Sequence, residues 1–88
     1  MKTIYRDNLF EKHFKTRVTP NEDLLKQFEL RFHMFKSGVR GKPLNDHGLK
    51  GKKRTFRAWS VTDDIRVVYR ETEEYYEFLD IGTHNQVY

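Results

Sequence analysis

Three strand-like segments in the second half of the chain constrain the fold more than any other feature. Residues 56–61, 65–70 and 75–81 are rich in aromatic and β-branched side chains, the residue types that are enriched in strands. Only three residues separate the first two segments, and four separate the last two. Parallel neighbours need a crossover of about a dozen residues or more, whereas antiparallel neighbours need only a tight turn. The spacing therefore predicts a three-stranded antiparallel meander.

The start of the chain predicts one short strand and a first helix. Residues 3–5, Thr-Ile-Tyr, favour a strand. Asn8 is followed three residues later by Glu11, which is the spacing of a helix-capping box. This pattern predicts a helix over residues 9–16 with Asn8 as its N-cap.

A second helix is predicted by a stronger signal. Thr19 offers a cap, Pro20 suits the first helical position, and Glu22 completes a capping box. Gly38 suits the position just beyond the helix end. The apolar residues on one helical face are Leu24, Leu25, Phe28, Phe32 and Phe35. The element order β-α-α-β-β-β predicts a single α+β domain over residues 1–88, with two N-terminal helices packed on one face of a small antiparallel sheet.

Alternate residues of a strand point to opposite faces of the sheet, which assigns the side chains of the last two strands. The side chains predicted to face the helices are Ile65, Val67, Tyr69, Leu79 and Ile81. The side chains predicted to lie on the other face are Arg66, Val68, Arg70, Phe78 and Asp80. That face is therefore expected to be an open, charged platform.

Basic residues are concentrated in the middle of the chain. Residues 36–57 hold eight Lys or Arg and one acid, Asp46, for a net charge of +7. The other residues hold nine bases and twelve acids, for a net charge of −3. A basic patch of this kind favours contact with a phosphate backbone, because each neutralised phosphate releases counterions. Glycines and Pro43 punctuate residues 38–51, which predicts that much of the patch lies on a loop.

The composition argues against several other classes of protein. The chain has no cysteine, which excludes disulfide scaffolds and thiolate metal sites and suits a reducing cytoplasm. No apolar run reaches the length of a signal peptide or of a transmembrane helix. The histidines are scattered, with no pair at metal-ligand spacing. These observations predict a soluble cytoplasmic protein with no metal, no cofactor and no membrane partner.

Several separated motifs give the chain a family resemblance. In chain order they are Asp46-His47-x-Leu49-x-Gly51, Phe56-Arg57, the segment 64–69 (Asp-Ile-Arg-Val-Val-Tyr), Ile81-Gly82-Thr83-His84 and the terminal aromatic residue Tyr88. With the predicted element order, these motifs resemble the RelE/ParE superfamily of toxins from bacterial type II toxin–antitoxin systems, and within it the YafQ-like branch of mRNA interferases. The resemblance runs nearly the full length of the chain and implies a RelE-like, microbial ribonuclease-type fold.

The resemblance also implies a function, namely a ribosome-dependent endoribonuclease that cleaves mRNA and is neutralised by a cognate antitoxin. The expected partners are mRNA, the ribosome and the antitoxin, with which the chain would form a hetero-oligomer. Two alternatives stay open: a ParE-like toxin that inhibits gyrase, and a catalytically degenerate toxin that only binds its antitoxin. The degenerate alternative is motivated by Ser60, Ile65 and Asp80, which stand where YafQ-like proteins have His, Trp and Arg.

The family's site residues map onto five positions of this chain. His47, Asp64, His84 and Tyr88 match the family's motifs, and Arg66 resembles the strand arginine of RelE-type members. RNA cleavage without a metal needs a base for the 2′-hydroxyl, an acid for the departing 5′-oxygen and cations for the phosphoryl oxygens. Histidine suits both proton transfers because it titrates near neutral pH. Arginine suits the third task because its fork matches two phosphoryl oxygens.

A second set of residues is predicted to bind RNA. Its members are Lys50, Lys52, Lys53, Arg54 and Arg57. A basic run of this length is also typical of a solvated loop, and the predicted catalytic residues have ordinary structural alternatives too. His47 would be a solvated loop residue, Asp64 the end of a hairpin turn and Tyr88 a core residue at the chain end. His84 would cap the final strand.

Overall fold

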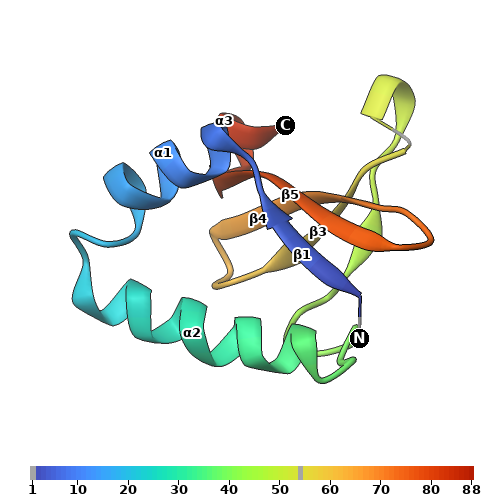
Figure 1. Ribbon diagram of the computed structural model, residues 1–88. Helices are drawn as coiled ribbons and strands as arrows, with labels where there is room; N and C mark the ends of the chain where they lie inside the picture. Colours follow the sequence, from blue (N-terminus) through green and yellow to red (C-terminus); the bar gives the residue numbers. More distant parts are fainter. Residues whose placement is uncertain (1, 54) are drawn as a thin grey trace.

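Two N-terminal helices cover one face of a five-stranded sheet (Figure 1). The computed structural model describes residues 2–53 and 55–88. The strands are β1 (Thr3–Arg6), β2 (His47–Gly48), β3 (Arg57–Ser60), β4 (Ile65–Glu71) and β5 (Tyr75–Thr83). The helical elements are α1 (Asn8–Arg17), α2 (Glu22–Lys36), the 3-10 turn η1 (Gly51–Lys53) and α3 (His84–Val87). The predicted α+β class and the order of the main elements are confirmed.

The sheet has the strand order β1-β5-β4-β3-β2 and is mixed. β3, β4 and β5 pair antiparallel, which confirms the predicted meander. β1 pairs parallel with β5, so the sheet is not antiparallel throughout as predicted. A parallel pair needs a long connection, and here all the elements between β1 and β5 supply it. β2 adds a two-residue edge strand, antiparallel to β3, within the segment predicted as a loop.

Both long helices begin at a residue other than the predicted one. In α1 the N-cap is Asp7, and Asn8 is already helical. The backbone N–H of Asp7 donates to the Phe78 carbonyl (3.0 Å), so the pairing of β1 runs directly into the helix without a separate cap at Asn8. In α2 the N-cap is Asn21, whose Oδ1 accepts a hydrogen bond from the Leu24 N–H (3.1 Å).

Thr19 does not cap α2 because it completes α1. Its hydroxyl donates to the Lys15 carbonyl (2.9 Å), one of the carbonyls that the end of a helix leaves without an intrahelical partner. The predicted end of α2 is confirmed, since the helix stops at Lys36 and Gly38 takes a φ of +96°, which favours glycine. None of the helices in the described part of the chain is long and apolar enough to span a membrane.

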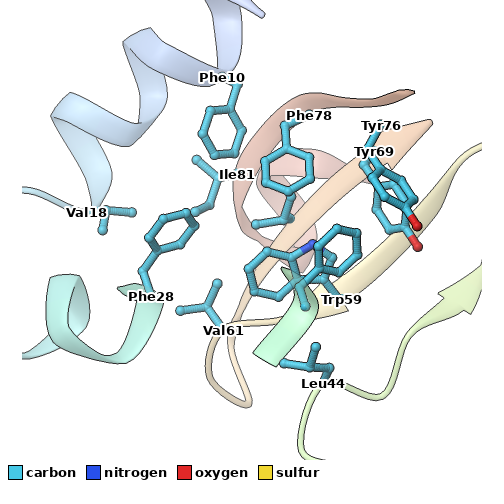
Figure 2. Close-up of a cluster of buried hydrophobic side chains, with 12 residues drawn as sticks. Phe10, Val18, Phe28, Leu44, Trp59, Val61, Tyr69, Tyr76, Phe78 and Ile81 are labelled. Carbon is cyan, nitrogen blue, oxygen red and sulfur yellow. The ribbon is translucent and has the colours of Figure 1, made fainter. Parts of the chain in front are cut away.

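The larger core lies between the two long helices and the sheet (Figure 2). Its buried side chains are Phe10, Val18, Phe28, Phe35, Leu44, Trp59, Val61, Val67, Tyr69, Tyr76, Phe78 and Ile81. Phe35 of α2 packs on Trp59 and Tyr69, with ring centroids 5.5 Å and 5.2 Å away. Such aromatic contacts add to the free energy that burial contributes. The apolar face predicted for the second helix is therefore confirmed.

The predicted alternation of side chains is confirmed in β4 and wrong for Phe78 and Leu79 of β5. Val67 and Tyr69 face the helices, and Val68 faces the opposite side. In β5, Phe78 belongs to the helix-covered core and Leu79 to the opposite face, the reverse of the prediction. The error therefore lies at the point where Phe78 and Leu79 of β5 lie beside the middle of β4.

A β-bulge explains this error. The pairing of β4 with β5 shifts register between Val68 and Tyr69, so β5 carries one extra residue at this point. The bulge returns Ile81 to the helix-covered core, as predicted. Asp80 pairs with Val68, which places it on the predicted face, and its Oδ1 lies 2.5 Å from His13 Nδ1 of α1.

The face opposite the long helices is not fully open, because the C-terminal turn folds over it. The buried side chains there are Ala58, Val68 and Val87, and the half-buried ones around them are Leu49, Phe56, Leu79 and Tyr88. α3 begins with a capping box in which the Thr83 and Gln86 side chains each contact the other residue's backbone. A Cβ at Gly82 would lie only 2.6 Å from Gln86 Oε1, so glycine lets this turn sit close to β5. The small core under α3 sets the positions of His84 and Tyr88.

Candidate active site

One cavity brings the two predicted histidines together. It has a volume of about 430 Å³ and is lined by His47, Gly48, Leu49, Lys50, Lys53, His84 and Tyr88. One wall comes from β2 and the segment up to η1, and the other wall comes from α3 and the residue after it. β2 pairs with β3 while α3 packs on β4 and β5, so the sheet fixes both walls relative to each other.

The α3 wall joins an imidazole, a phenol and a guanidinium. The rings of His84 and Tyr88 meet edge to face, with centroids 4.3 Å apart at 76°. Arg66 of β4 reaches both, because its Nη1 lies 3.5 Å from His84 Nδ1 and its Cζ lies 5.8 Å from the Tyr88 ring centroid. A guanidinium has only donors, so His84 Nδ1 accepts and a neutral His84 carries its proton on Nε2. In that tautomer Nε2 is the hydrogen-bond donor of the His84 ring.

Tyr88 and Arg66 also carry polar atoms that the described part of the chain does not pair. The Tyr88 hydroxyl and the Arg66 Nε are buried without a hydrogen-bond partner among residues 2–53 and 55–88. Burial raises the pKa of Tyr88, and the positive charge of Arg66 offsets only part of the rise, so the phenol is neutral at physiological pH. Buried polar atoms are normally paired, so these two atoms, like Trp59 Nε1 in the larger core, are exceptions to the usual pattern.

His47 forms the opposite wall, where β2 pairs it with Ala58 of β3. Its side chain is exposed, and its Nδ1 lies 3.0 Å from the Asn45 carbonyl oxygen. A carbonyl only accepts, so Nδ1 donates and a neutral His47 keeps a free lone pair on Nε2. Asn45 has a φ of 49°, a left-handed conformation that asparagine tolerates better than most residues. His47 is thus arranged as a proton acceptor, the opposite of His84.

The residue before His47 is a carboxylate with no exposed side-chain surface. Asp46 Oδ1 accepts from Arg57 Nε (2.8 Å) and Nη2 (2.7 Å), and its Oδ2 accepts from the Tyr69 hydroxyl (2.5 Å). Burial, followed by the hydrogen bond to Asp46, raises the pKa of Tyr69 well above its usual range. The hydrogen bond to Asp46 likewise raises the pKa of Arg57. Both partners therefore remain donors across the physiological range.

The sequence predicts Arg57 as an RNA contact and assigns no role in the site to Asp46 or Tyr69. The structure shows that Arg57 has two of its donors committed to Asp46, although part of its side chain stays exposed. One signal could have revealed the pair: Asp46 is the only acid among residues 36–57, and a lone carboxylate among eight cations is well placed for an ion pair.

Asp64 is not among the residues that line the cavity. It is exposed on the turn between β3 and β4, where its N–H donates to the Thr62 hydroxyl (3.2 Å). The same hydroxyl accepts from the Ile65 N–H (3.0 Å), so Thr62 organises the turn. The structure therefore brings together His47, His84, Tyr88 and Arg66 and leaves Asp64 on the neighbouring turn.

The predicted RNA-binding lysines differ in their surroundings. Lys50 is exposed and lines the cavity. Lys53 also lines it, but its Nζ donates to the Val87 carbonyl (2.9 Å) and to a main-chain oxygen of Tyr88 (3.3 Å), which ties η1 to α3 and the residue after it. Arg54 and the side chain of Lys52 lie outside the described residues.

The three residues that depart from the YafQ-like pattern each make contacts within the fold. Ser60 is buried in β3, and its N–H donates to the Leu44 carbonyl (2.7 Å). Ile65 packs against the larger core, and Asp80 binds α1. Among residues 2–53 and 55–88, no group of three or more His, Asp or Glu side chains is close enough together to hold a metal ion.

No protein-family model and no curated protein matches this sequence. Solved structures do match it. YafQ from E. coli shares 19% identity over 100% of this chain and 99% of its own, with a TM-score of 0.82. In the E. coli DinJ–YafQ complex, the matching chain shares 20% identity over 100% of this chain and 99% of its own, with a TM-score of 0.81. A metal-bound toxin from Helicobacter pylori shares 24% identity over 100% of both chains, with a TM-score of 0.79. At these identities the comparison establishes the architecture, and the chain has the RelE-like toxin fold that its motifs predict.

Proposed function

We propose that this chain is the toxin of a toxin–antitoxin pair and an endoribonuclease that cleaves mRNA on the ribosome. The observation that carries the proposal is one cavity in which His47 offers an acceptor nitrogen and His84 a donor nitrogen. Cleavage of a phosphodiester by acid–base catalysis uses one group of each kind in the same step. A toxin that only bound gyrase would need neither the acceptor nitrogen nor the donor nitrogen.

The proposed reaction uses the 2′-hydroxyl of the RNA as nucleophile. His47 Nε2 takes the proton of this hydroxyl while its oxygen bonds to the adjacent phosphorus. The bond from phosphorus to the 5′-oxygen breaks, and His84, in its protonated imidazolium form, supplies from Nε2 the proton that this oxygen needs. The products are a 2′,3′-cyclic phosphate and a 5′-hydroxyl, and the two histidines exchange protonation states.

The groups next to the histidines suit the charge that develops on the phosphoryl oxygens. Arg66 lies beside His84, and Lys50 lines the same cavity, so both cations are near the proposed position of the phosphate. Positive charge fixed in place before the reaction stabilises such a transition state. The Tyr88 ring offers a surface for a base, because aromatic side chains stack on bases without regard to sequence.

Two partners are part of the proposal. E. coli YafQ, which shares the fold, has been crystallised in the DinJ–YafQ toxin–antitoxin complex. A comparable antitoxin is proposed for this chain. The net charge of +7 over residues 36–57 supports contact with the phosphates of mRNA or ribosomal RNA.

The test is to express the chain under an inducible promoter and map new mRNA 5′ ends soon after induction. Cuts confined to translated regions and in phase with codons are expected for the wild-type chain. His47→Ala and His84→Ala should each remove the cuts and the growth arrest, while His33→Ala should behave as wild type. His33 is a matched control because it is exposed on α2, away from the cavity.

Other results would support the alternatives. DNA damage without in-frame cuts would indicate gyrase inhibition. Normal growth and intact mRNA with the wild-type chain would indicate a degenerate toxin, which Ser60, Ile65 and Asp80 would then explain. Full toxicity of both His→Ala variants would contradict the proposed roles of the histidines.

A further inference from the structure

The edge strand that carries His47 has little support of its own. β2 contains only two residues, and it pairs with β3 along one side because it lies at the edge of the sheet. The His47 ring is exposed, so packing does not fix it. A catalytic base must be held within a fraction of an ångström of its working position, which requires support from neighbouring side chains.

Asp46, the residue directly before β2, provides that support. The Asp46 side chain has no exposed surface and is held from two sides, by Arg57 of β3 and by the Tyr69 hydroxyl of β4. The two partners lie 11 and 23 residues further along the chain, so the contacts fix the segment before His47 against the sheet. A buried carboxylate is costly unless it is paired in this way, which makes any other position of Asp46 unfavourable.

Arg57 extends the same support to the residue after His47. Gly48 pairs with Arg57 in the sheet, and a Cβ at Gly48 would lie 3.5 Å from Arg57 Nη1. The guanidinium therefore binds the residue before His47, which is Asp46, and lies close to the residue after it, which is Gly48. It is anchored to the larger core through Asp46, because Tyr69 is fully buried against Phe35.

We infer that Asp46, Arg57 and Tyr69 form a positioning network that holds His47 in its acceptor orientation. None of the three is a catalytic residue, because each acts on the reaction through His47. The network links the tyrosine of the helix-covered core to the base proposed on the opposite face. Its catalytic consequence rests on the proposed function, whereas its effect on the His47 ring does not.

The clearest variant is Tyr69→Phe, which removes one hydroxyl and keeps the buried ring. Its matched control is Tyr76→Phe. Tyr76 lies in the same core, and its hydroxyl accepts from Arg40 Nη2 (3.0 Å), away from Asp46. Asp46→Asn is a second variant, which keeps the shape of the side chain and removes the charge that holds Arg57.

Two measurements separate positioning from simple loss of stability. The first is the nitrogen NMR signals of the histidine rings, which report whether Nδ1 or Nε2 carries the proton. In the wild-type chain His47 should be the Nδ1-protonated form. In Tyr69→Phe and Asp46→Asn its signals should shift toward a tautomer mixture, with no change at His33. The second is the single-turnover rate of mRNA cleavage on ribosomes, expected to fall about 10-fold in Tyr69→Phe and less than 2-fold in Tyr76→Phe.

Each outcome has one reading. If the His47 signals shift and the rate falls without weaker ribosome binding, both the network and the proposed function are supported. If the His47 signals shift but even the wild-type chain does not cleave mRNA, the network stands and the proposed function fails. If the His47 signals in Tyr69→Phe and Asp46→Asn match those of Tyr76→Phe, the network is only structural and the inference is overturned.

Discussion

The two faces of the sheet are held in different ways. On the face covered by α1 and α2, twelve buried side chains form one core, and eight of these are aromatic or large aliphatic residues buried to 2% exposure or less, including Phe35 and Trp59. On the opposite face, three buried side chains support a four-residue helix. Hydrophobic stabilisation scales with the apolar area removed from water, so most of it belongs to the first face. The second face therefore has fewer apolar contacts to hold the residues that line the cavity.

The largest effect is expected from truncating the main core. Phe35→Ala removes a ring that packs on Trp59, Tyr69, Tyr76 and Phe78, and should lower the free energy of unfolding by ~3–5 kcal/mol. Urea denaturation followed by circular dichroism measures this change. Leu30→Ala on the same helix is the control, because Leu30 is exposed and its loss should cost less than ~0.5 kcal/mol. Similar losses for the two variants would show that the core under α1 and α2 does not supply most of the stability.

The second effect is on activity rather than stability. His84→Gln removes the proposed proton donor and should slow RNA cleavage on ribosomes by ~100-fold. The free energy of unfolding should change by less than ~1 kcal/mol, since His84 is exposed and loses only its contacts with Tyr88 and Arg66. A variant that unfolds but cleaves RNA at the normal rate when folded would place His84 among structural residues.

A smaller effect is expected where α3 meets β5. In Gly82→Ala the new Cβ would lie 2.6 Å from both Arg17 Nη1 and Gln86 Oε1. These atoms donate to the Ile81 carbonyl and accept from the Thr83 N–H, so moving them weakens both bonds and should cost ~1–2 kcal/mol. Gly41→Ala is the control, because nothing lies within 4 Å of its new Cβ. Equal thermal stability of the two variants would show that α3 adapts freely.

The smallest effect is a pH dependence that Tyr69 should cause. Its pKa is raised in the folded chain, so the folded state keeps the proton that the unfolded state loses above about pH 10. Stability from this group is complete below that pH and falls as the pH rises further. The wild-type chain should lose up to ~1 kcal/mol more than Tyr69→Phe between pH 10 and 11. Denaturation curves at pH 9, 10 and 11 measure the difference, and parallel losses in both proteins would contradict it.

The elements with a local signal could be predicted from the sequence. The strands of the meander follow from their composition and short turns, and the apolar face of α2 follows from its periodicity. α3 also had a signal that the prediction did not use, because Thr83 and Gln86 have the capping-box spacing. The parallel pairing of β1 with β5 had none, since it joins residues at opposite ends of the chain.

In the candidate site, too, residues with a local sequence signal were predicted and contacts between distant residues were not. His47, His84, Tyr88 and Arg66 were found through motifs, and the structure brings them to one place. The contacts of Asp46 that support His47 were not predicted, because the burial of Asp46 depends on partners on two other strands. Contacts of this kind are decided by the register of the sheet, which the sequence does not reveal.

The β-bulge in β5 has a consequence for how chains of this fold can diverge. The extra residue opposite Val68 places Leu79 under α3 and Asp80 against His13. A substitution at either position would change one contact, but deletion of either residue would remove the bulge and shift one end of β5 by one residue relative to β4. Lineages should therefore vary in residue type along β5 far more readily than in its length. Sequence alignments that place a gap between residues 78 and 81 should be treated as a change in the shape of the site.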